Sequence, residues 1–472
     1  MGFRRPPDDG AFPGREHLKL AGAAFLFIAC MVVIFVSILL EPVSAVPLAA
    51  TAPDSTQPVI QHVVIIFQEN RSTDNLFHGL ANADIADSGV NSKGDTIPLK
   101  PLPLDSDYDL GHKHDAFVKM YDKGKMDGAD KVDVLCNYGS RNCPPPNPQF
   151  KYVRPGDVAP YFQMAETYAF GDRMFQTNQG PSFPAHQFII SGTSAPSASS
   201  RSFAAENPAG GIKHPGYQTG CTAPKREYVL LIDPSGREGK KLYPCYEHGA
   251  LSDLLDTAGL SWRYYTPSAK FLWTGPNAIR HIRFGPDWKN VIVGQANILQ
   301  DIKNGKLPAV SWVIPGGLQS DHAGGNNGTG PSWVASVVNA IGGSQYWSST
   351  AIFITWDDWG GWYDHVAPKV IHDGRSWGSG YAYGFRVPLV IVSPYANPGY
   401  VSHVTHDFSS ILRFTEEVFG LPSLGFGDAY ADDLFDSFNF GQQPRAFHTI
   451  VAPHDEDYFL NDKEPPTDPD DD

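Results

Sequence analysis

Four short runs of apolar residues lack the alternation that marks a strand with one solvent-facing side. These runs are His62–Phe67, Ala309–Ile314, Ala351–Trp356 and Val387–Ser393. A strand that is apolar at successive positions buries both faces, as in a parallel sheet covered by helices. The runs therefore predict strands of a central, mostly parallel sheet.

Segments with helical character separate these strands. We predict helices at Pro160–Ala169, Ala185–Ser191, Leu251–Ala258, Gly330–Ile341 and Ser409–Phe419. Strands that alternate with helices over about 390 residues predict one large α/β/α sandwich with a mostly parallel central sheet. The Gly- and Pro-rich stretch Asn207–Tyr246 is expected to form an excursion over one end of it.

The N-terminus carries a longer apolar run, Leu20–Leu40, which is uncharged and follows four basic residues. As a helix it is long enough to cross a bilayer, and Val43-Ser44-Ala45 offers a small-residue cleavage site. A cleaved signal peptide and an uncleaved signal anchor both fit this pattern. Either one exports the remainder, which is then periplasmic, secreted or anchored to the outer face of the cytoplasmic membrane.

These patterns divide the chain into three parts. We expect residues 1–58 to form the signal or anchor with its linker, and residues 59–454 to form the main folded domain. Residues 455–472 end in PPTDPDDD and predict an acidic disordered tail. The net charge of −15 and the lack of a Lys/Arg cluster exclude a nucleic-acid partner.

Four cysteines outside the apolar run agree with export. Two disulfides, most simply Cys136–Cys143 and Cys221–Cys245, fit an oxidising compartment, although four cysteines allow three pairings. Zinc binding is the alternative, but the chain has no C-x-x-C spacing.

Polar residues follow two of the predicted strands directly. Glu69 and Asn70 follow the first strand closely, and Asp357 and Asp358 end the run Ala351–Trp356. Sites in open α/β sheets form beyond the carboxyl ends of strands, so these residues can meet there. Three carboxylates and an amide oxygen suit a divalent cation, whereas a solvated strand end or a helix cap is the structural alternative.

Ser182 is a candidate nucleophile because it follows a Gly-Pro turn and precedes a predicted helix, whose N-terminus favours an anion. Its hydroxyl needs activation by a base or a metal. His186 lies only four residues further on, but no Ser-His-Asp order is evident. The alternative is a serine that only caps the helix. Gly-x-Ser-x-Gly is absent here, which disfavours an α/β-hydrolase elbow.

Several of the 16 histidines stand beside acidic residues, and imidazole can bind a phosphoryl oxygen or protonate a leaving group. His322, in a Gly-rich loop after a predicted strand, is the best candidate. His112 and His114 stand together in GHKHD. A structural or surface role is the alternative for each.

At these residues the sequence resembles the phosphoesterase family of bacterial phospholipases C and acid phosphatases. The resemblance runs in order from about residue 60 to 440 through the blocks HVVIIFQENRSTDNLFHG, GKMDGAD, GPSFPAHQFIISGT, TAIFITWDDWGGWYDHVAP, YGFRVPLVIVSPYA and HVTHDFSSILRFTEEVFGL.

The resemblance implies an alkaline-phosphatase-like fold and hydrolysis of phosphate esters through a phosphoserine. It implies one divalent ion, Ca²⁺, Mg²⁺, Mn²⁺ or Zn²⁺. The implied metal ligands are Glu69, Asn70, Ser182, Asp357 and Asp358. His112 and His322 would act on the phosphoryl or leaving group, and Asn70, His114 and His281 would contact the substrate.

Two departures separate the chain from many phospholipases C. It has Ser182 where they have Thr, and Asp358 where they often have Glu. Both features resemble the acid-phosphatase branch, so we expect an acid phosphatase acting on phosphomonoesters. A phospholipase C is the alternative, followed by a non-catalytic envelope protein. A sulfatase-like hydrolase is disfavoured, because its Cys/Ser-x-Pro-x-Arg motif lacks the Arg here.

Overall fold

An eight-stranded sheet forms the centre of the molecule. The computed structural model describes residues 59–210, 218–369 and 383–467. The strands lie in the order β14-β13-β15-β1-β16-β17-β8-β18. Their bounds are β14 Val291–Val293, β13 Trp262–Thr266, β15 Val310–Val313, β1 His62–Gln68, β16 Thr350–Trp356, β17 Leu389–Val392, β8 Ala169–Gly171 and β18 Tyr400–Ser402.

All four predicted strands are present in this sheet, which is mostly parallel as expected. β17 is the exception, because it runs antiparallel to both β16 and β8. β1 lies between β15 and β16 and is parallel to both, and it is buried from Val63 to Gln68. In the β1–β16 register Gln68 pairs with Trp356, so both strands end at the same level.

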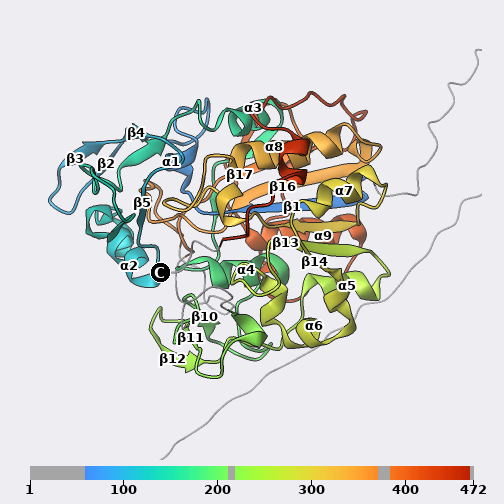
Figure 1. The fold of residues 1–472 in the computed structure, drawn as a ribbon, viewed down its shortest axis with the longest axis horizontal. Coiled ribbons are helices and arrows are strands. Elements are labelled where there is room, and N and C mark those ends of the chain that lie inside the picture. The colour runs from blue at the N-terminus through green and yellow to red at the C-terminus, as the bar shows by residue number, and fades with distance from the viewer. Residues whose placement is uncertain (1–58, 211–217, 370–382, 468–472) are drawn as a thin grey trace, which may run out of the picture. The chain divides into compact units, whose positions relative to one another are not determined.

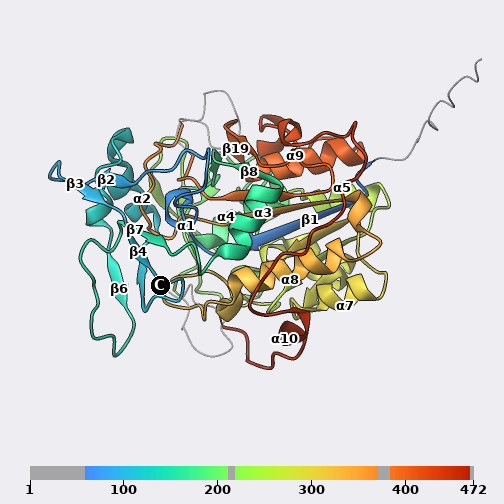
Figure 2. The same ribbon diagram turned by 90° about the horizontal axis from the view of Figure 1, so that it is seen from above.

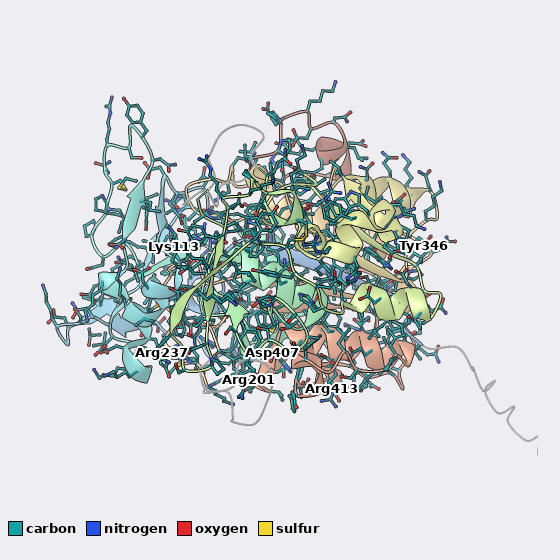
Figure 3. All side chains as sticks on the ribbon, turned by 90° about the horizontal axis from the view of Figure 1, so that it is seen from below. Lys113, Arg201, Arg237, Tyr346, Asp407 and Arg413 are labelled. Carbon is teal, nitrogen blue, oxygen red and sulfur yellow. A yellow bond between two sulfur atoms is a disulfide. The ribbon has the colours of Figure 1, made fainter. Side chains whose placement is uncertain are left out.

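Helices cover both faces of the sheet, which confirms the α/β/α sandwich (Figures 1 and 2). One layer contains α3 Ala159–Thr167, α7 Asn297–Lys303, α8 Gly330–Gly342 and α10 Glu456–Leu460, and the other contains α4 Ser182–Ser191, α5 Leu251–Thr257 and α9 Phe408–Phe419. The five predicted helices are therefore all present. α4 begins at Ser182, three residues before the predicted start at Ala185. Asp407, labelled in Figure 3, caps α9 by accepting a hydrogen bond from the amide of Ser409 (2.7 Å).

The segment between β1 and α3 forms a smaller layer beside the sheet (Figure 1). It contains α1 Thr73–Leu76, α2 His114–Tyr121, β2 Ser88–Val90, β3 Thr96–Pro98, β4 Lys100–Leu102, β5 Tyr108–Leu110, β6 Val134–Cys136 and β7 Lys151–Val153. Its apolar cluster takes in Trp359 and Trp362, from the loop that follows β16. Gly360 turns this loop with φ +61°, and a Cβ there would lie 2.4 Å from the carbonyl oxygen of Asn70.

The predicted excursion contributes β11 Val229–Ile232 and β12 Glu238–Leu242 to a three-stranded sheet, whose third strand, β10 Phe203–Ala204, comes just before it in the chain. Both disulfides form with the expected pairing, Cys136–Cys143 and Cys221–Cys245.

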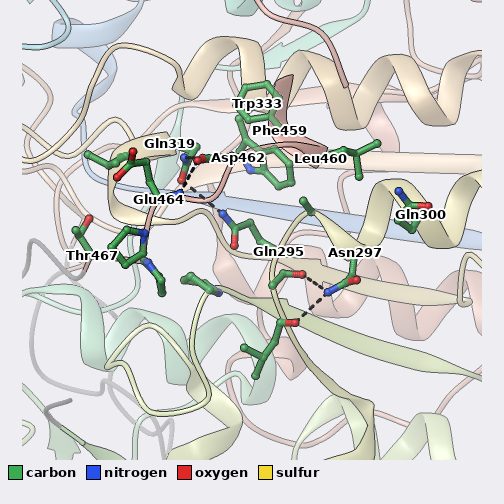
Figure 4. A pocket seen from close by; sticks show the side chains of 17 residues that line it. Gln295, Asn297, Gln300, Gln319, Trp333, Phe459, Leu460, Asp462, Glu464 and Thr467 are labelled. Carbon is green, nitrogen blue, oxygen red and sulfur yellow. Dashed lines mark hydrogen bonds between the residues drawn. The ribbon is translucent and has the colours of Figure 1, made fainter. Parts of the chain in front are cut away.

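The acidic C-terminus differs from the expected disordered tail as far as residue 467. Phe459 of α10 is buried and packs edge-on against Trp333 of α8, with ring centroids 5.4 Å apart. Gln319 donates from Nε2 to Asp462 Oδ2 (2.6 Å), and the segment closes a cavity of about 370 Å³ (Figure 4). An aromatic anchor outweighs the acidic composition here, because burying one ring stabilises a short segment by roughly 1.5–3 kcal/mol.

All residues that the structure describes belong to one compact unit. Within the described ranges, no helix combines the length and apolarity needed to cross a bilayer. The run Leu20–Leu40 and its predicted cleavage site lie outside those ranges.

Candidate metal centre

Four polar residues meet beyond the ends of β1 and β16. Because the two strands end in register, Glu69 and Asn70 emerge beside Asp357 and Asp358, and all four side chains are fully buried. The amide of Asp357 donates to the carbonyl oxygen of Gln68 (2.9 Å), which extends the ladder to the point where the carboxylates begin. The meeting of these two clusters, predicted from the strand-end rule, is confirmed.

Ser182 joins this group from the first turn of α4. Its Oγ donates to Glu69 Oε2 (3.0 Å) and lies 3.5 Å from Asp358 Oδ2. The amide of Phe183 donates to Asn207 Oδ1 (2.9 Å), which holds the start of the helix. Ser182 is fully buried among these groups, so its hydroxyl faces carboxylates rather than bulk solvent.

His186 is a member of the site that the sequence did not assign. It lies one turn after Ser182 on α4, and its Nε2 is 2.8 Å from Glu69 Oε1. Glu69, His186 and Asp357 each offer a ligand atom, and these atoms lie within 4.8 Å of one another. The sequence signal that could have assigned His186 to the site is its i, i+4 spacing from Ser182, because residues four apart share one face of a helix.

His112 fixes the orientation of Asn70. His112 Nδ1 donates to the carbonyl oxygen of Leu110 (2.8 Å), so Nε2 is left to accept from Asn70 Nδ2 (3.4 Å). The amide oxygen of Asn70 therefore points away from the imidazole, and this buried atom accepts no hydrogen bond from any described residue.

The residues present fit a divalent cation. Three buried carboxylates in one site repel each other unless positive charge compensates them. The oriented amide oxygen and the serine oxygen add two neutral ligands of the kind that such cations accept.

His322 lies beside His112, with ring centroids 5.6 Å apart, and its Nδ1 donates to the carbonyl oxygen of Ala323 (2.8 Å). The preceding residue, Asp321, anchors this loop by accepting from Tyr161 Oη (2.8 Å) and Trp356 Nε1 (2.9 Å). Burial raises the pKa of Asp321 to about 6, although the bond from Tyr161 opposes the rise.

His114 and His281, the two histidines expected to contact the substrate, differ in where they lie. His114 donates from Nδ1 to the carbonyl oxygen of Gln179 (3.0 Å), so it supports the loop that precedes Ser182. His281 instead contacts Glu247 (2.6 Å) and Asp253 (3.0 Å) on a partly exposed surface, and the bond to Asp253 raises its pKa to about 9. Both ring nitrogens of His281 are thus engaged by carboxylates, and its contact with a substrate stays a prediction.

A second buried acidic group contains Asp74, Asp364 and His365. Arg386 fills it with a bidentate pair to Asp364 (2.9 and 3.1 Å) and a bond to Asp74 Oδ1 (3.0 Å). The guanidinium supplies positive charge here, and this group ties the loops after β1 and β16 together. A third group, at the sheet edge near β18, pairs His406 with Asp432 (2.9 Å).

The fold and the site together define an α/β/α protein with a carboxylate-rich, metal-compatible centre at the carboxyl ends of its parallel strands. A profile of the Phosphoesterase family matches residues 60–422, and the chain therefore belongs to that family.

Phospholipases C are among the relatives. The chain is 28% identical over 270 residues to phospholipase C B of Mycobacterium tuberculosis, covering 48% of this chain and 51% of that protein. It is 26% identical over 437 residues to the non-hemolytic phospholipase C of Pseudomonas aeruginosa, covering 81% and 57%. The chain thus spans about half the length of these curated relatives. Among solved structures, a protein in the alkaline phosphatase superfamily from Vibrio parahaemolyticus matches 81% of this chain and 72% of its own, with 11% identity and a TM-score of 0.36.

Proposed function

We propose that this chain is a metal-dependent phosphoesterase that hydrolyses phosphate esters through a phosphoserine at Ser182. The observation that carries the proposal is the buried hydroxyl of Ser182, held 3.0 Å from Glu69 Oε2 beside the two aspartates of β16. Membership of the Phosphoesterase family supports the same reaction class.

One divalent ion would be held by Glu69, Asn70, Ser182, Asp357 and Asp358, with Ca²⁺, Mg²⁺, Mn²⁺ and Zn²⁺ all compatible with the ligands. When bound, it would lower the effective pKa of the serine hydroxyl and screen the charge of the phosphate.

The residues of the chain supply the remaining steps. In the first step a bond forms between Ser182 Oγ and phosphorus, the ester P–O bond breaks, and Glu69 Oε2 takes the hydroxyl proton. The imidazole of His112 or His322 gives a proton to the departing alcohol. In the second step a hydroxyl from water replaces the serine oxygen on phosphorus. The other proton of that water restores the imidazole, and Glu69 returns its proton to Ser182.

We propose phosphomonoesters as substrates, in the manner of an acid phosphatase, with maximal activity at mildly acidic pH because protonated imidazoles act on the leaving group. An activity that rises steadily to pH 9 would contradict this pH dependence. The phospholipase C relatives favour a second candidate, cleavage of phospholipid headgroups. Comparing turnover of p-nitrophenyl phosphate with that of a phosphocholine diester separates the two.

The two disulfides support an exported enzyme, since they persist in oxidising compartments. Whether the N-terminal run acts as a cleaved signal or as an anchor is a separate proposal, tested by sequencing the N-terminus of the mature protein.

The decisive experiment compares the metal-loaded protein with Ser182→Ala on p-nitrophenyl phosphate. We expect the variant to lose activity, and acid-quenched wild-type enzyme to carry phosphate on the peptide that contains Ser182. Equal activity in both proteins would refute the proposal.

A further inference from the structure

We propose that His186 is a positioning residue that fixes the carboxylate of Glu69 for the cation. This inference rests on the proposed metal-dependent function and adds to it a residue outside the predicted ligand set.

The two oxygens of Glu69 have different partners, both on α4. Oε1 lies 2.8 Å from His186 Nε2, and Oε2 accepts from Ser182 Oγ at 3.0 Å. All three side chains are fully buried. With one oxygen held by each residue, the plane of the carboxylate is fixed relative to the helix.

His186 is itself held from its other side. Its Nδ1 lies 3.3 Å from Tyr264 Oη, which in turn donates to the carbonyl oxygen of Trp273 (2.8 Å). The imidazole is therefore held between Glu69 and Tyr264.

Hydrogen-bond partners of metal ligands contribute measurably to affinity, and removing one typically weakens metal binding by about 10–100-fold. His186→Phe keeps an aromatic ring but removes both ring nitrogens, so we expect that loss for the variant. His186→Gln retains an amide that can donate to Glu69, and we expect a smaller loss.

Gln187 offers a matched control. It is the next residue of α4, equally buried, and donates to the carbonyl oxygen of Gly275 (3.3 Å) rather than to the site. Gln187→Met removes a buried hydrogen bond from the same helix turn, and we expect its metal affinity to equal that of the wild type.

Calorimetric titration of the metal-free protein with Mn²⁺ or Zn²⁺ alone tests the proposal without relying on turnover. Thermal unfolding of each metal-free variant shows whether a lost affinity reflects lost folding. A wild-type affinity in folded His186→Phe would overturn the proposal, and so would an equal loss in Gln187→Met.

Paramagnetic resonance of the Cu²⁺-loaded protein supplies a second readout. If a nitrogen coupling is present in the wild type and lost in His186→Phe, His186 is a direct ligand and the positioning role is wrong. Full activity of Ser182→Ala would refute the proposed reaction, whereas the metal titrations test the role of His186 independently.

Discussion

Replacing Arg386 by Met should destabilise the fold more than any exposed charge substitution. The guanidinium is fully buried and touches two fully buried carboxylates, Asp364 and Asp74. It also donates to the carbonyl oxygens of Asp84 (2.9 Å) and Asp172 (2.8 Å). Methionine fills much of the side-chain volume but satisfies none of these acceptors.

The expected magnitude follows from this burial. Removing one partner of a buried ion pair typically costs about 3–5 kcal/mol, because the remaining charge is left uncompensated. Burial already raises the pKa of Asp364, and the neighbouring Asp74 adds to the rise, whereas Arg386 opposes it. Arg386→Met leaves Asp364 without its guanidinium partner, whereas Asp74 keeps its contact with His365 (2.8 Å), so we expect a loss within that range.

Urea unfolding followed by circular dichroism measures this loss. The double variant Arg386→Met, Asp364→Asn removes the uncompensated charge of Asp364 and should recover part of the stability. Arg237, labelled in Figure 3, is the control because its side chain is 81% exposed and pairs only locally with Asp233. Arg237→Met should change stability by less than about 0.5 kcal/mol. The reasoning is refuted if Arg386→Met destabilises no more than Arg237→Met.

Three further predictions follow from individual contacts. Asp357→Asn removes one buried carboxylate from the centre and should weaken Mn²⁺ binding at least about tenfold in calorimetry; unchanged affinity would exclude Asp357 as a ligand. Burial opposes the charge of His365, but its bond to Asp74 outweighs this and raises the pKa to about 9. The resulting stability is fully present below the unfolded-state pKa of roughly 6.5 and is lost as pH rises through about 9. His365→Gln should therefore remove a pH dependence of about 1–2 kcal/mol between pH 7 and 10 in urea unfolding, and parallel pH profiles would contradict this. Gly360→Ala places a Cβ 2.4 Å from the carbonyl oxygen of Asn70 at φ +61°, so thermal unfolding should show a loss above about 1 kcal/mol, whereas an unchanged midpoint would show that the loop yields.

The parts of the site that the sequence predicted are those that depend on local pattern. An apolar run followed directly by carboxylates places those carboxylates at a strand end, and parallel neighbours bring two such ends together. Glu69 and Asp357 meet for this reason. Ser182 was predicted as a site residue because it follows a Gly-Pro turn and precedes a helix, which is also a local signal.

The parts that were missed depend on contacts between distant segments. Arg386 meets Asp74 across 312 positions of the chain, and no local pattern marks an arginine before a strand as the partner of an earlier loop. The antiparallel direction of β17 was missed because an apolar run does not show whether a strand lies parallel or antiparallel to its neighbours. β14, β8 and β18 are only three residues long, too short for periodicity to detect.

The frame around the centre explains how three carboxylates can be held close together in one protein. The loops after β1 and β16 are joined at their near ends by the bond between Asp357 and Gln68. At their far ends, Ser72 Oγ donates to the carbonyl oxygen of Tyr363 (2.8 Å), and Arg386 bridges the two loops. Each loop is thus fixed on both sides of its metal-ligand candidates, so repulsion between the carboxylates cannot separate the loops without breaking buried hydrogen bonds. The geometry of the centre is therefore set by the sheet and by Arg386, so the proposed cation would supply charge rather than organise the fold.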